Sequence, residues 1–341
     1  MGRSQGLFTA GASGMLDLLG GSGFIGTRLA KRCEERGRAF TLIDKAPSAR
    51  FPGAHRFADV RDVDSLRAAM TGGPVVNLAA EHRDDVRPVS LYEAVNVQGA
   101  RNVCQVATEK GVRTIVFTST VAVYGFAPPN TDEAGAINPF NAYGRTKWEA
   151  ERVYREWYEV DPANRTLVIL RPTVVFGEQN RGNVYNLLRQ IASGRFVMVG
   201  SGQNRKSMAY VENIAAFLEF SLSFRSGCYV YNYVDKPDFD MNALVATVRE
   251  RLGAGPGPGF RLPYMLGLGA GYAFDIAAWA TKRTFPISSI RVRKFCATTQ
   301  FATSIAETGF EAPVSLQEGL LRTVRHEFLE DHRDEQVFVS E

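Results

Sequence analysis

The stretch LDLLGGSGFIGTRLAKR, residues 16–32, decides the fold. A short apolar run leads into three glycines, Gly20, Gly23 and Gly26, and a helical stretch follows to about Gly37. Glycine lets the backbone turn sharply and approach a pyrophosphate, which then lies at the positive N-terminus of the helix. The spacing predicts a dinucleotide-binding turn between strand and helix, although a purely structural glycine turn is the alternative reading of this stretch alone.

Apolar runs and helical periods alternate along the first half of the chain. The runs lie at 39–43, 75–78, 114–118 and 166–170. This alternation predicts an α/β fold with a doubly wound parallel sheet of the Rossmann type. Past Arg171 the alternation becomes irregular, which predicts a smaller, mixed α/β substrate-binding region on the C-terminal side.

These patterns predict how the chain is divided. Residues 1–14 are small and polar, lack the features of a secretory signal, and are expected to form a flexible leader. The expected division is a Rossmann domain at 15–175 with return segments near 207–235, a substrate-binding region at 176–206 and 236–330, and a tail at 331–341.

Composition narrows the class of protein. The 341 residues are 45% apolar and 22% charged, as in ordinary soluble globular proteins. The net charge of +4 comes without a long basic run, so no nucleic-acid partner is expected. The cysteines stand far apart, with no Cys/His ligand spacing; reduced cytosolic thiols are expected, and no metal site is predicted. They are Cys33, Cys104, Cys228 and Cys296.

Asp44, at the end of the second apolar run, indicates which dinucleotide is bound. A carboxylate there accepts hydrogen bonds from the ribose hydroxyls and repels a 2′-phosphate, which favours NAD over NADP. A capping aspartate is the alternative. Asp59–Val60 and the turn Leu78-Ala79-Ala80 stand where adenine and ribose would pass, but a solvated turn with core packing explains them nearly as well.

Tyr143 and Lys147 are four residues apart and so share one face of a helix. A free tyrosine has a pKa of about 10 and is a poor base at neutral pH. A neighbouring ammonium and the positive nicotinamide ring favour the phenolate and bring it towards the working range. Thr120 follows a strand and can bond the same substrate oxygen. The set predicts hydride transfer at an alcohol carbon.

With these residues in place, the chain resembles the extended short-chain dehydrogenase/reductase family from Met15 to about Phe328. The stretches LAA (78–80), VNVQG with Asn96, VYG (123–125), YGRTK and RPTVVFG (171–177) fall in family order. The resemblance implies that Tyr143 is the acid/base, Lys147 bonds the nicotinamide ribose, and Thr120 bridges to the substrate. It implies these further cofactor contacts: Phe24, Ile25, Asn96, Pro172 and Val174.

Two departures from the family pattern narrow the chemistry. Val121 and Ala122 follow Thr120, where family dehydratases carry Asp-Glu and decarboxylases carry Glu. The resemblance therefore implies plain hydride chemistry, by an epimerase or an alcohol/keto oxidoreductase. Leu19 replaces the threonine that usually precedes the first glycine, a smaller difference.

Longer stretches resemble a narrower group, the bacterial 4-epimerases of polyprenyl-diphosphate-linked N-acetylglucosamine in O-antigen (lipopolysaccharide) synthesis. The resemblance implies interconversion with N-acetylgalactosamine on undecaprenyl diphosphate, membrane association at the cytoplasmic face of the inner membrane, and a homodimer through helices near 96–110 and 143–158. The matching stretches are LAAEHRDDVRPVSLY (78–92), FGEQNRGNVYNLLRQIA (176–192), KSMAYVENI (206–214), YNYVDKPD (231–238), SSIRVRKFCATTQF (288–301) and FVSE (338–341).

Candidate substrate residues follow from the needs of a diphosphate sugar. Cations at Arg181, Arg205 and Lys206 could hold the diphosphate, although a role as solvated surface charges explains them equally well. Amides at two positions could bond phosphate or sugar, with helix capping as the alternative; these are Asn183 and Asn186. His82 and Arg83 follow the LAA turn, where nicotinamide and sugar would meet, with a structural role as the alternative.

The segment 262–280, LPYMLGLGAGYAFDIAAWA, is close to spanning length. Its glycines, Pro263 and Asp275 favour a segment lying at a membrane interface over a spanning one. Basic residues flank it, which suits an anionic membrane surface; a buried lid over the substrate is the alternative. The flanking residues are Arg261, Lys282, Arg283, Arg291, Arg293 and Lys294.

Three other functions remain open at this point. A soluble UDP-sugar 4-epimerase or a 4-ketoreductase would use the same tyrosine and lysine. A steroid-type hydroxyl dehydrogenase would explain the apolar segment but leave the arginine and asparagine loops without a purpose. A non-catalytic NAD-binding sensor would not need to keep both Tyr143 and Lys147.

Overall fold

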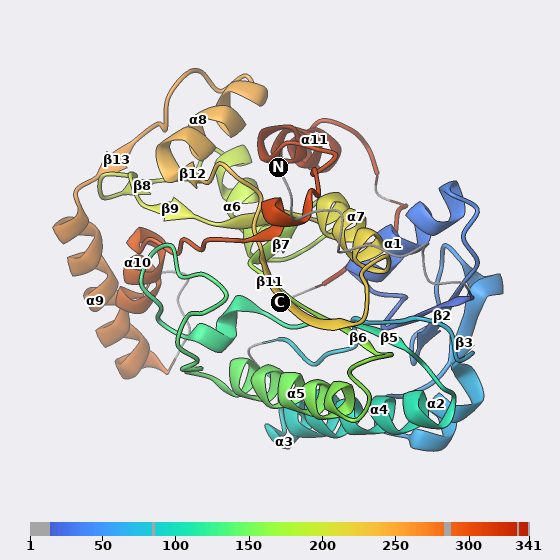
Figure 1. Cartoon of the computed structure of the whole chain (residues 1–341). Coiled ribbons are helices and arrows are strands. Elements are labelled where there is room, and N and C mark those ends of the chain that lie inside the picture. The colour runs from blue at the N-terminus through green and yellow to red at the C-terminus, as the bar shows by residue number, and fades with distance from the viewer. Residues whose placement is uncertain (1–13, 84–85, 283–287, 333, 340–341) are drawn as a thin grey trace.

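The computed structural model describes residues 14–83, 86–282, 288–332 and 334–339. Its centre is a parallel sheet of seven strands in the order β11-β6-β5-β4-β1-β2-β3 (Figure 1). This confirms the predicted doubly wound sheet. The strands are β1 (Leu16–Leu19), β2 (Phe40–Asp44), β3 (His55–Phe57), β4 (Val75–Asn77), β5 (Thr114–Thr118), β6 (Thr166–Pro172) and β11 (Gly227–Tyr233).

Helices cover both faces of the sheet, which is why its inner strands are almost continuously apolar. Successive side chains of a strand point to opposite faces. On β5, Ile115 and Phe117 therefore pack in the core under one helical layer, while Val116 packs in the core under the other. One layer contains α1 (Phe24–Glu35) and α7 (Val211–Ser221), and the other contains α2 (Val63–Ala69), α4 (Gly99–Glu109) and α5 (Ala142–Glu159) (Figure 1). Before α4 the chain forms a short helix, α3 (Ser90–Tyr92), and a π-helical turn, η3 (Glu93–Gln98).

The second region is built from segments that leave the sheet and come back. The chain departs after β6 and returns in β11, which pairs with β6. A third core lies between helices α6 (Asn183–Ala192), α8 (Met241–Arg251) and α11 (Leu316–Phe328). Short strand pairs surround it: β7 (Val174–Phe176) with β10 (Met208–Tyr210), β9 (Arg205–Lys206) with β12 (Phe239–Asp240), and β8 (Met198–Val199) with β13 (Arg261–Leu262).

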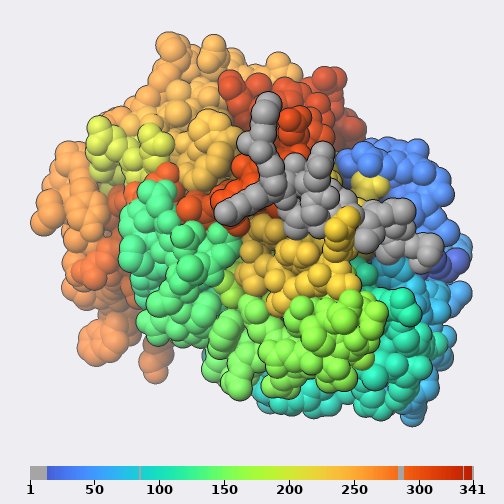
Figure 2. Space-filling model, viewed as in Figure 1, coloured from blue at the N-terminus to red at the C-terminus, as the bar shows by residue number. Residues whose placement is uncertain are grey.

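Helix α9 (Tyr264–Thr281) packs against α10 (Ser289–Cys296) and carries most of the predicted apolar segment. Only Gly267 and Gly271 of α9 are buried; they lie against Val199 and the backbone of Ser289. Figure 2 shows this region as orange atoms at the left edge of the molecule. Among the described residues, no helix is both long and apolar enough to cross a membrane.

The strand at 114–118 has the predicted bounds, and the other predicted strands differ from the prediction by one or two residues at one or both ends. Two strands of the sheet, β3 and β11, were not predicted. Short 3-10 turns connect some of the elements: η2 (Pro52–Ala54), η4 (Val121–Tyr124) and η5 (Ile305–Thr308). The predicted leader at 1–14 lies outside the described residues except for Gly14, as do Arg283 and the last two residues of FVSE.

Candidate active site

A cavity of about 530 Å³ lies at the carboxyl ends of the sheet strands. Residues at or just after the ends of β1, β2, β4, β5 and β6 meet there, as in other open α/β sheets, whose ligands bind at this edge. Its lining comprises Gly20, Gly23, Phe24, Ile25, Gly26, Ile43, Asp44, Lys45, Ala58, Asp59, Val60, Leu78, Ala79, Ala80, Glu81, His82, Val95, Thr118, Ser119, Thr120, Tyr143, Lys147, Pro172, Thr173, Val174, Val175, Asn180, Gly182 and Asn183.

The glycine loop has the form that a pyrophosphate needs. Gly20 has a φ of +71°, and a Cβ there would lie 2.6 Å from the backbone nitrogen of Ala79. A Cβ on Gly26 would lie 2.6 Å from Gly21 Cα, so α1 packs tightly on the turn. Helix α1 begins at Phe24. In this described part of the chain, no side chain caps the helix and its first turn contains no acidic residue. The free N–H groups and the helix dipole therefore suit an anionic group.

Asp44 is fixed beside this loop. Its Oδ2 accepts a hydrogen bond of 3.1 Å from the backbone N–H of Ser22, and its Oδ1 accepts one of 3.0 Å from Ala46. Farther along the cavity, hydrogen bonds from Arg61 hold the pKa of Asp59 below its ordinary value, so this carboxylate stays ionised. The glycine loop, Asp44 and the apolar wall with Val60 fit an adenine dinucleotide without a 2′-phosphate.

Thr120, Tyr143 and Lys147 line the other part of the same cavity. Helix α5 begins after Asn141, whose Oδ1 accepts a hydrogen bond of 2.8 Å from Gly144 N–H. A Cβ on Gly144 would lie 2.5 Å from the carbonyl oxygen of Ala122, so α5 packs directly on η4. Thr120 precedes η4, and its Oγ1 accepts a hydrogen bond of 3.1 Å from Ala122 N–H.

Lys147 is buried, with its Nζ 4.2 Å from the centroid of the Phe117 ring. Burial lowers the pKa of Lys147 to about 7, and the negative charge of Glu151 acts against this shift. A lysine with this pKa passes between its charged and neutral forms near neutral pH. It can therefore respond to a ligand or to the protonation of Tyr143.

A buried polar network lies behind these residues. Glu151 accepts a 2.6 Å hydrogen bond from Ser119 Oγ, and two bonds from Arg171, of 2.9 Å from Nε and 2.6 Å from Nη2. Arg171 also donates to the hydroxyl of Tyr124 at 2.7 Å, and Tyr124 donates to Oδ1 of Asn232 at 2.8 Å. The network joins α5 to β5, β6 and β11, so it holds the helix that carries Tyr143 and Lys147 in position on the sheet.

The sequence matches the NAD dependent epimerase/dehydratase family over residues 18–232. It is also 52% identical over 329 residues to the N-acetyl-alpha-D-glucosaminyl-diphospho-ditrans,octacis-undecaprenol 4-epimerase of Escherichia coli O157:H7, covering 95% of this chain and 98% of the relative. The chain belongs to the NAD-dependent epimerase/dehydratase family. Membership confirms the predicted extended short-chain dehydrogenase/reductase and its cofactor, NAD.

Solved structures agree with the family fold. The UDP-N-acetylglucosamine 4-epimerase of Bacillus cereus superposes with a TM-score of 0.71 at 15% identity, covering 92% of this chain and 98% of the other. The UDP-glucose 4-epimerase of Thermus thermophilus, in complex with NAD, gives 0.68 at 20% identity with the same coverage. At these identities the likeness supports the fold alone.

Asn96 does not line the cavity, unlike the other cofactor contacts expected for this family. It is buried in η3, where Oδ1 accepts a 2.9 Å hydrogen bond from Glu81 N–H. Its Nδ2 donates to Glu81 O and to Thr146 Oγ1, both at 3.0 Å. Asn96 therefore fixes the loop after β4 against α5, and acts on the cavity through Glu81.

The predicted substrate residues divide into two groups. Three of them, Thr120, His82 and Asn183, line the cavity. The others do not: Arg83, Arg181, Asn186, Arg205 and Lys206, whose Nζ donates instead to the carbonyl oxygens of Lys294 and Ala297. Burial lowers the pKa of His82, with the Lys147 charge adding to the effect, so the ring is neutral at pH 7. His82 is thus a hydrogen-bonding group at this pH rather than a cation.

Arg181, a predicted diphosphate ligand, lies outside the cavity lining and contacts other parts of the protein. Its guanidinium pairs with buried Glu327 and stacks on Tyr185, 4.1 Å from the ring centroid, and its backbone N–H donates to Phe338 O at 2.7 Å. Glu327, on α11, is 146 residues away in sequence, so the loop pattern alone could not reveal this pairing. Arg181 fastens the loop to the C-terminal segment.

The cavity also contains polar residues that the sequence analysis did not select. Ser119 stands between Thr118 and Thr120, so its position after β5 was a usable signal. Glu81 follows the LAA turn and is an acidic residue of the cavity lining. In the sequence, a catalytic carboxylate was sought only at positions 121 and 122, where the chain has Val121 and Ala122. The others are Lys45, Thr118, Thr173 and Asn180.

Proposed function

We propose that the protein is an NAD-dependent 4-epimerase that interconverts N-acetylglucosamine and N-acetylgalactosamine carried on a polyprenyl (undecaprenyl) diphosphate for surface-polysaccharide synthesis. The observation that carries the proposal is the meeting of Thr120, Tyr143 and Lys147 with the glycine loop and Asp44 in one cavity. The activity for which the 52% identical Escherichia coli relative is named supports the choice of substrate.

When bound, NAD supplies the acceptor and donor of a hydride, which amino-acid side chains cannot provide. The side chains of the protein remove and return the proton. Tyr143, as phenolate, removes the proton from the sugar 4-hydroxyl, and Thr120 bonds the same oxygen. After the 4-keto sugar has turned to present its opposite face, Tyr143 returns the proton to the oxygen. The configuration at C4 is then inverted without net oxidation.

Lys147 supports Tyr143 through charge. Its ammonium favours the phenolate of Tyr143 and can hydrogen-bond a ribose hydroxyl of the cofactor. Because its pKa is about 7, the protonated form is available at neutral pH without a strong energetic preference for it. The buried Glu151 beneath it helps to retain that charge.

The surface of α9 supports a lipid-linked substrate. Leu266, Ile276 and Trp279 are 62%, 67% and 83% exposed, although α9 contains a single charged residue, Asp275. Exposed basic residues Arg291 and Lys294 lie on the adjacent α10. Apolar side chains beside cations fit an anionic membrane surface, so this face is proposed to bring the enzyme to the inner membrane as a peripheral protein.

Vesicle binding tests the α9 face. The protein is expected to co-sediment with phosphatidylglycerol vesicles, and Leu266→Glu with Trp279→Glu should abolish this. Val160→Glu is the matched control, because Val160 is 74% exposed at the end of α5, on another part of the surface. Equal sedimentation of all three proteins would exclude α9 as the docking surface.

A homodimer through η3, α4 and α5 is the proposed assembly. These elements pack side by side on one face of the sheet, and α4 exposes polar residues such as Arg101 and Gln105. Sedimentation equilibrium of the full chain tests the assembly, and Arg101→Glu should shift it towards monomer. A monomeric wild-type protein at micromolar concentration would contradict the proposal.

Parallel incubations test the proposed reaction. The enzyme is given undecaprenyl-diphosphate N-acetylglucosamine and, separately, UDP-N-acetylglucosamine, and the sugar released by hydrolysis is identified. N-acetylgalactosamine is expected from the lipid substrate without added NADH. Conversion of the UDP sugar alone would instead favour a soluble 4-epimerase, and stoichiometric consumption of NADH would favour a 4-ketoreductase.

A further inference from the structure

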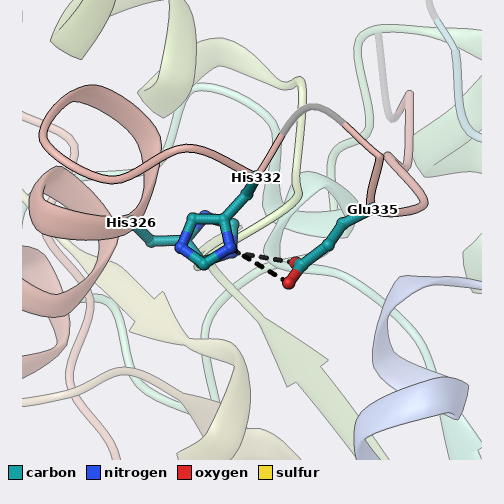
Figure 3. Close-up of side chains that lie close together, drawn as sticks. All are labelled: His326, His332 and Glu335. Carbon is teal, nitrogen blue, oxygen red and sulfur yellow. Dashed lines mark hydrogen bonds and ion pairs between the residues drawn. The ribbon is translucent and has the colours of Figure 1, made fainter.

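A cluster of metal-ligating side chains lies at the end of α11 and in the segment that follows it. Figure 3 shows the imidazole rings of His326 and His332 stacked, with the Glu335 carboxylate beside their nitrogens. The ring centroids are 3.9 Å apart and the planes differ by 3°. His326 Nε2 lies 3.1 Å from Glu335 Oε2, and His332 Nδ1 lies 3.0 Å from Glu335 Oε1. Both histidines therefore direct one nitrogen at the same carboxylate.

The opposite ring nitrogens face two other carboxylates. His332 Nε2 lies 3.0 Å from Glu330 Oε2. His326 Nδ1 is buried, forms no hydrogen bond, and lies 3.4 Å from Glu327 Oε1. A metal-bound histidine typically has its second nitrogen against a carboxylate, which orients the ring and makes it a better ligand. His332 already has that outer partner in Glu330, and the Glu327 carboxylate lies beside His326 Nδ1 without a hydrogen bond.

The charges of the cluster favour a cation. Glu327 pairs with Arg181 and Glu330 pairs with Arg325. Within the described part of the chain, the ion pairs of Glu335 are with the two histidines alone. The cluster thus combines two imidazole rings with a carboxylate that has no permanently charged partner among the described residues.

We infer that His326, His332 and Glu335 bind one divalent transition-metal ion of the zinc type. Two imidazole nitrogens and a carboxylate are ligands that Zn²⁺ and Co²⁺ accept, with water in the fourth position. The three donor atoms lie within 4.8 Å of one another. Tetrahedral zinc ligands at about 2.0–2.1 Å lie roughly 3.4 Å apart. The Glu335 oxygens already lie 3.1 Å and 3.0 Å from the two ring nitrogens. Because an imidazole binds a metal in the plane of its ring, the two stacked rings must turn towards the ion when it binds.

This site differs from the sequence-based expectation of no metal. The two histidines are separated by five residues and Glu335 follows after two more, a spacing that is not one of the common zinc patterns. The convergence depends on the turn that brings the segment after α11 back over its last turn. The sequence alone does not reveal that turn.

The metal would fasten the cavity wall. Gln179 Nε2 donates to Glu335 Oε2 at 2.6 Å, and Phe338 N–H donates to Gln179 O at 2.8 Å. The same loop contributes Asn180 and Gly182 to the cavity lining. The Phe338 ring also lies 5.7 Å from that of Phe24, at the start of α1. An ion joining α11 to this segment would therefore steady the loop beside the cofactor, whichever sugar the enzyme uses.

Metal titration of the full-length, chelator-treated protein tests the site. Co²⁺ should bind at one equivalent per chain, give the absorption bands of a four-coordinate ion, and be displaced by Zn²⁺. His332→Gln and Glu335→Gln should each lower the affinity at least tenfold. Glu318→Gln should bind as the wild type does, because Glu318 is exposed on the same helix and pairs only with Arg322 among the described residues.

A second measurement, which does not use enzymatic activity, tests whether the metal ion steadies the loop beside the cofactor. Zn²⁺ should slow the release of bound NAD and raise the melting temperature of the wild type, with neither effect in Glu335→Gln. Binding that is equal in the wild type and both site variants, or no binding at micromolar Zn²⁺, overturns the site. Site-specific metal binding without a change in NAD release overturns the claim that the ion steadies this loop. Neither result depends on the epimerase assignment, since no sugar substrate is present.

Discussion

Glu151 and Arg171 form a buried ion pair with two hydrogen bonds. Glu151 lies on α5, one helical turn beyond Lys147, and Arg171 lies on β6. The two side chains are 0% and 3% exposed. Two parallel N–H···O bonds fix the geometry of the pair as well as its charge. The pair therefore links the position of helix α5 to the sheet and places a negative charge close to Lys147.

Replacing Glu151 by Gln should destabilise the protein by about 3 to 5 kcal/mol, because it leaves the Arg171 charge buried without its partner. Urea unfolding measures the loss. Glu149→Gln on the same helix is the control, because Glu149 forms an ion pair with the half-exposed Arg145 and should cost less than about 1 kcal/mol. Similar losses in the two variants would show that the buried pair has no special role.

The depressed pKa of Lys147 should appear in the pH dependence of stability. In the folded, NAD-free protein this pKa is about 7, against an ordinary value of 10.5. Between these values the unfolded chain binds more protons, so stability rises with pH, by up to about 1.4 kcal/mol per pH unit. Lys147→Met should remove this slope between pH 7 and 9. Parallel stability curves for the two proteins would show that Lys147 titrates normally.

Replacing Tyr143 by Phe should lower turnover about 10²- to 10⁴-fold, the usual range for loss of an acid/base group. NAD content after purification should be unchanged, because the ring remains in the cavity wall. Tyr158→Phe, on the same helix but packed in the core, should keep normal turnover. A Tyr143→Phe enzyme with near-normal turnover would remove Tyr143 from the proposed reaction.

Asp44→Asn should weaken the preference for NAD. Loss of the negative charge removes the repulsion of a 2′-phosphate and weakens the bonds to ribose hydroxyls. The ratio of NADP to NAD dissociation constants should fall at least tenfold, about 1.4 kcal/mol. Calorimetric titration of NAD-free protein measures both constants, with the exposed Asp64→Asn as control. An unchanged ratio would place cofactor selection elsewhere.

The sequence predicted those parts of the fold in which local pattern and burial agree. The run at 114–118 is buried on both faces and appears as β5 with the predicted ends. Strand β3, in contrast, is three residues long with exposed Arg56 and Phe57 at the edge of the sheet. Its residues HRF form no apolar run, so only pairing with β2 reveals it.

In the candidate site, too, the residues that belong to local motifs were predicted and those with distant partners were not. The glycine loop, Asp44 and the pair Tyr143 and Lys147 have fixed local spacings, and all of them line the cavity. Arg181 and Asn96 were assigned to ligands because their partners could not be read from the chain nearby. Side-chain pairing over long sequence separations is decided by packing, which a motif does not describe.

The departure of the chain after β6 and its return in β11 has a consequence for exchanging parts between relatives. Strand β11 completes the sheet, yet it follows α6 and precedes α8, which share one core of the second region. No single cut separates the nucleotide-binding part of the chain from the part proposed to bind the sugar. A chimera that takes its sugar specificity from another enzyme therefore needs several junctions at once, and a one-crossover hybrid would combine two incomplete cores.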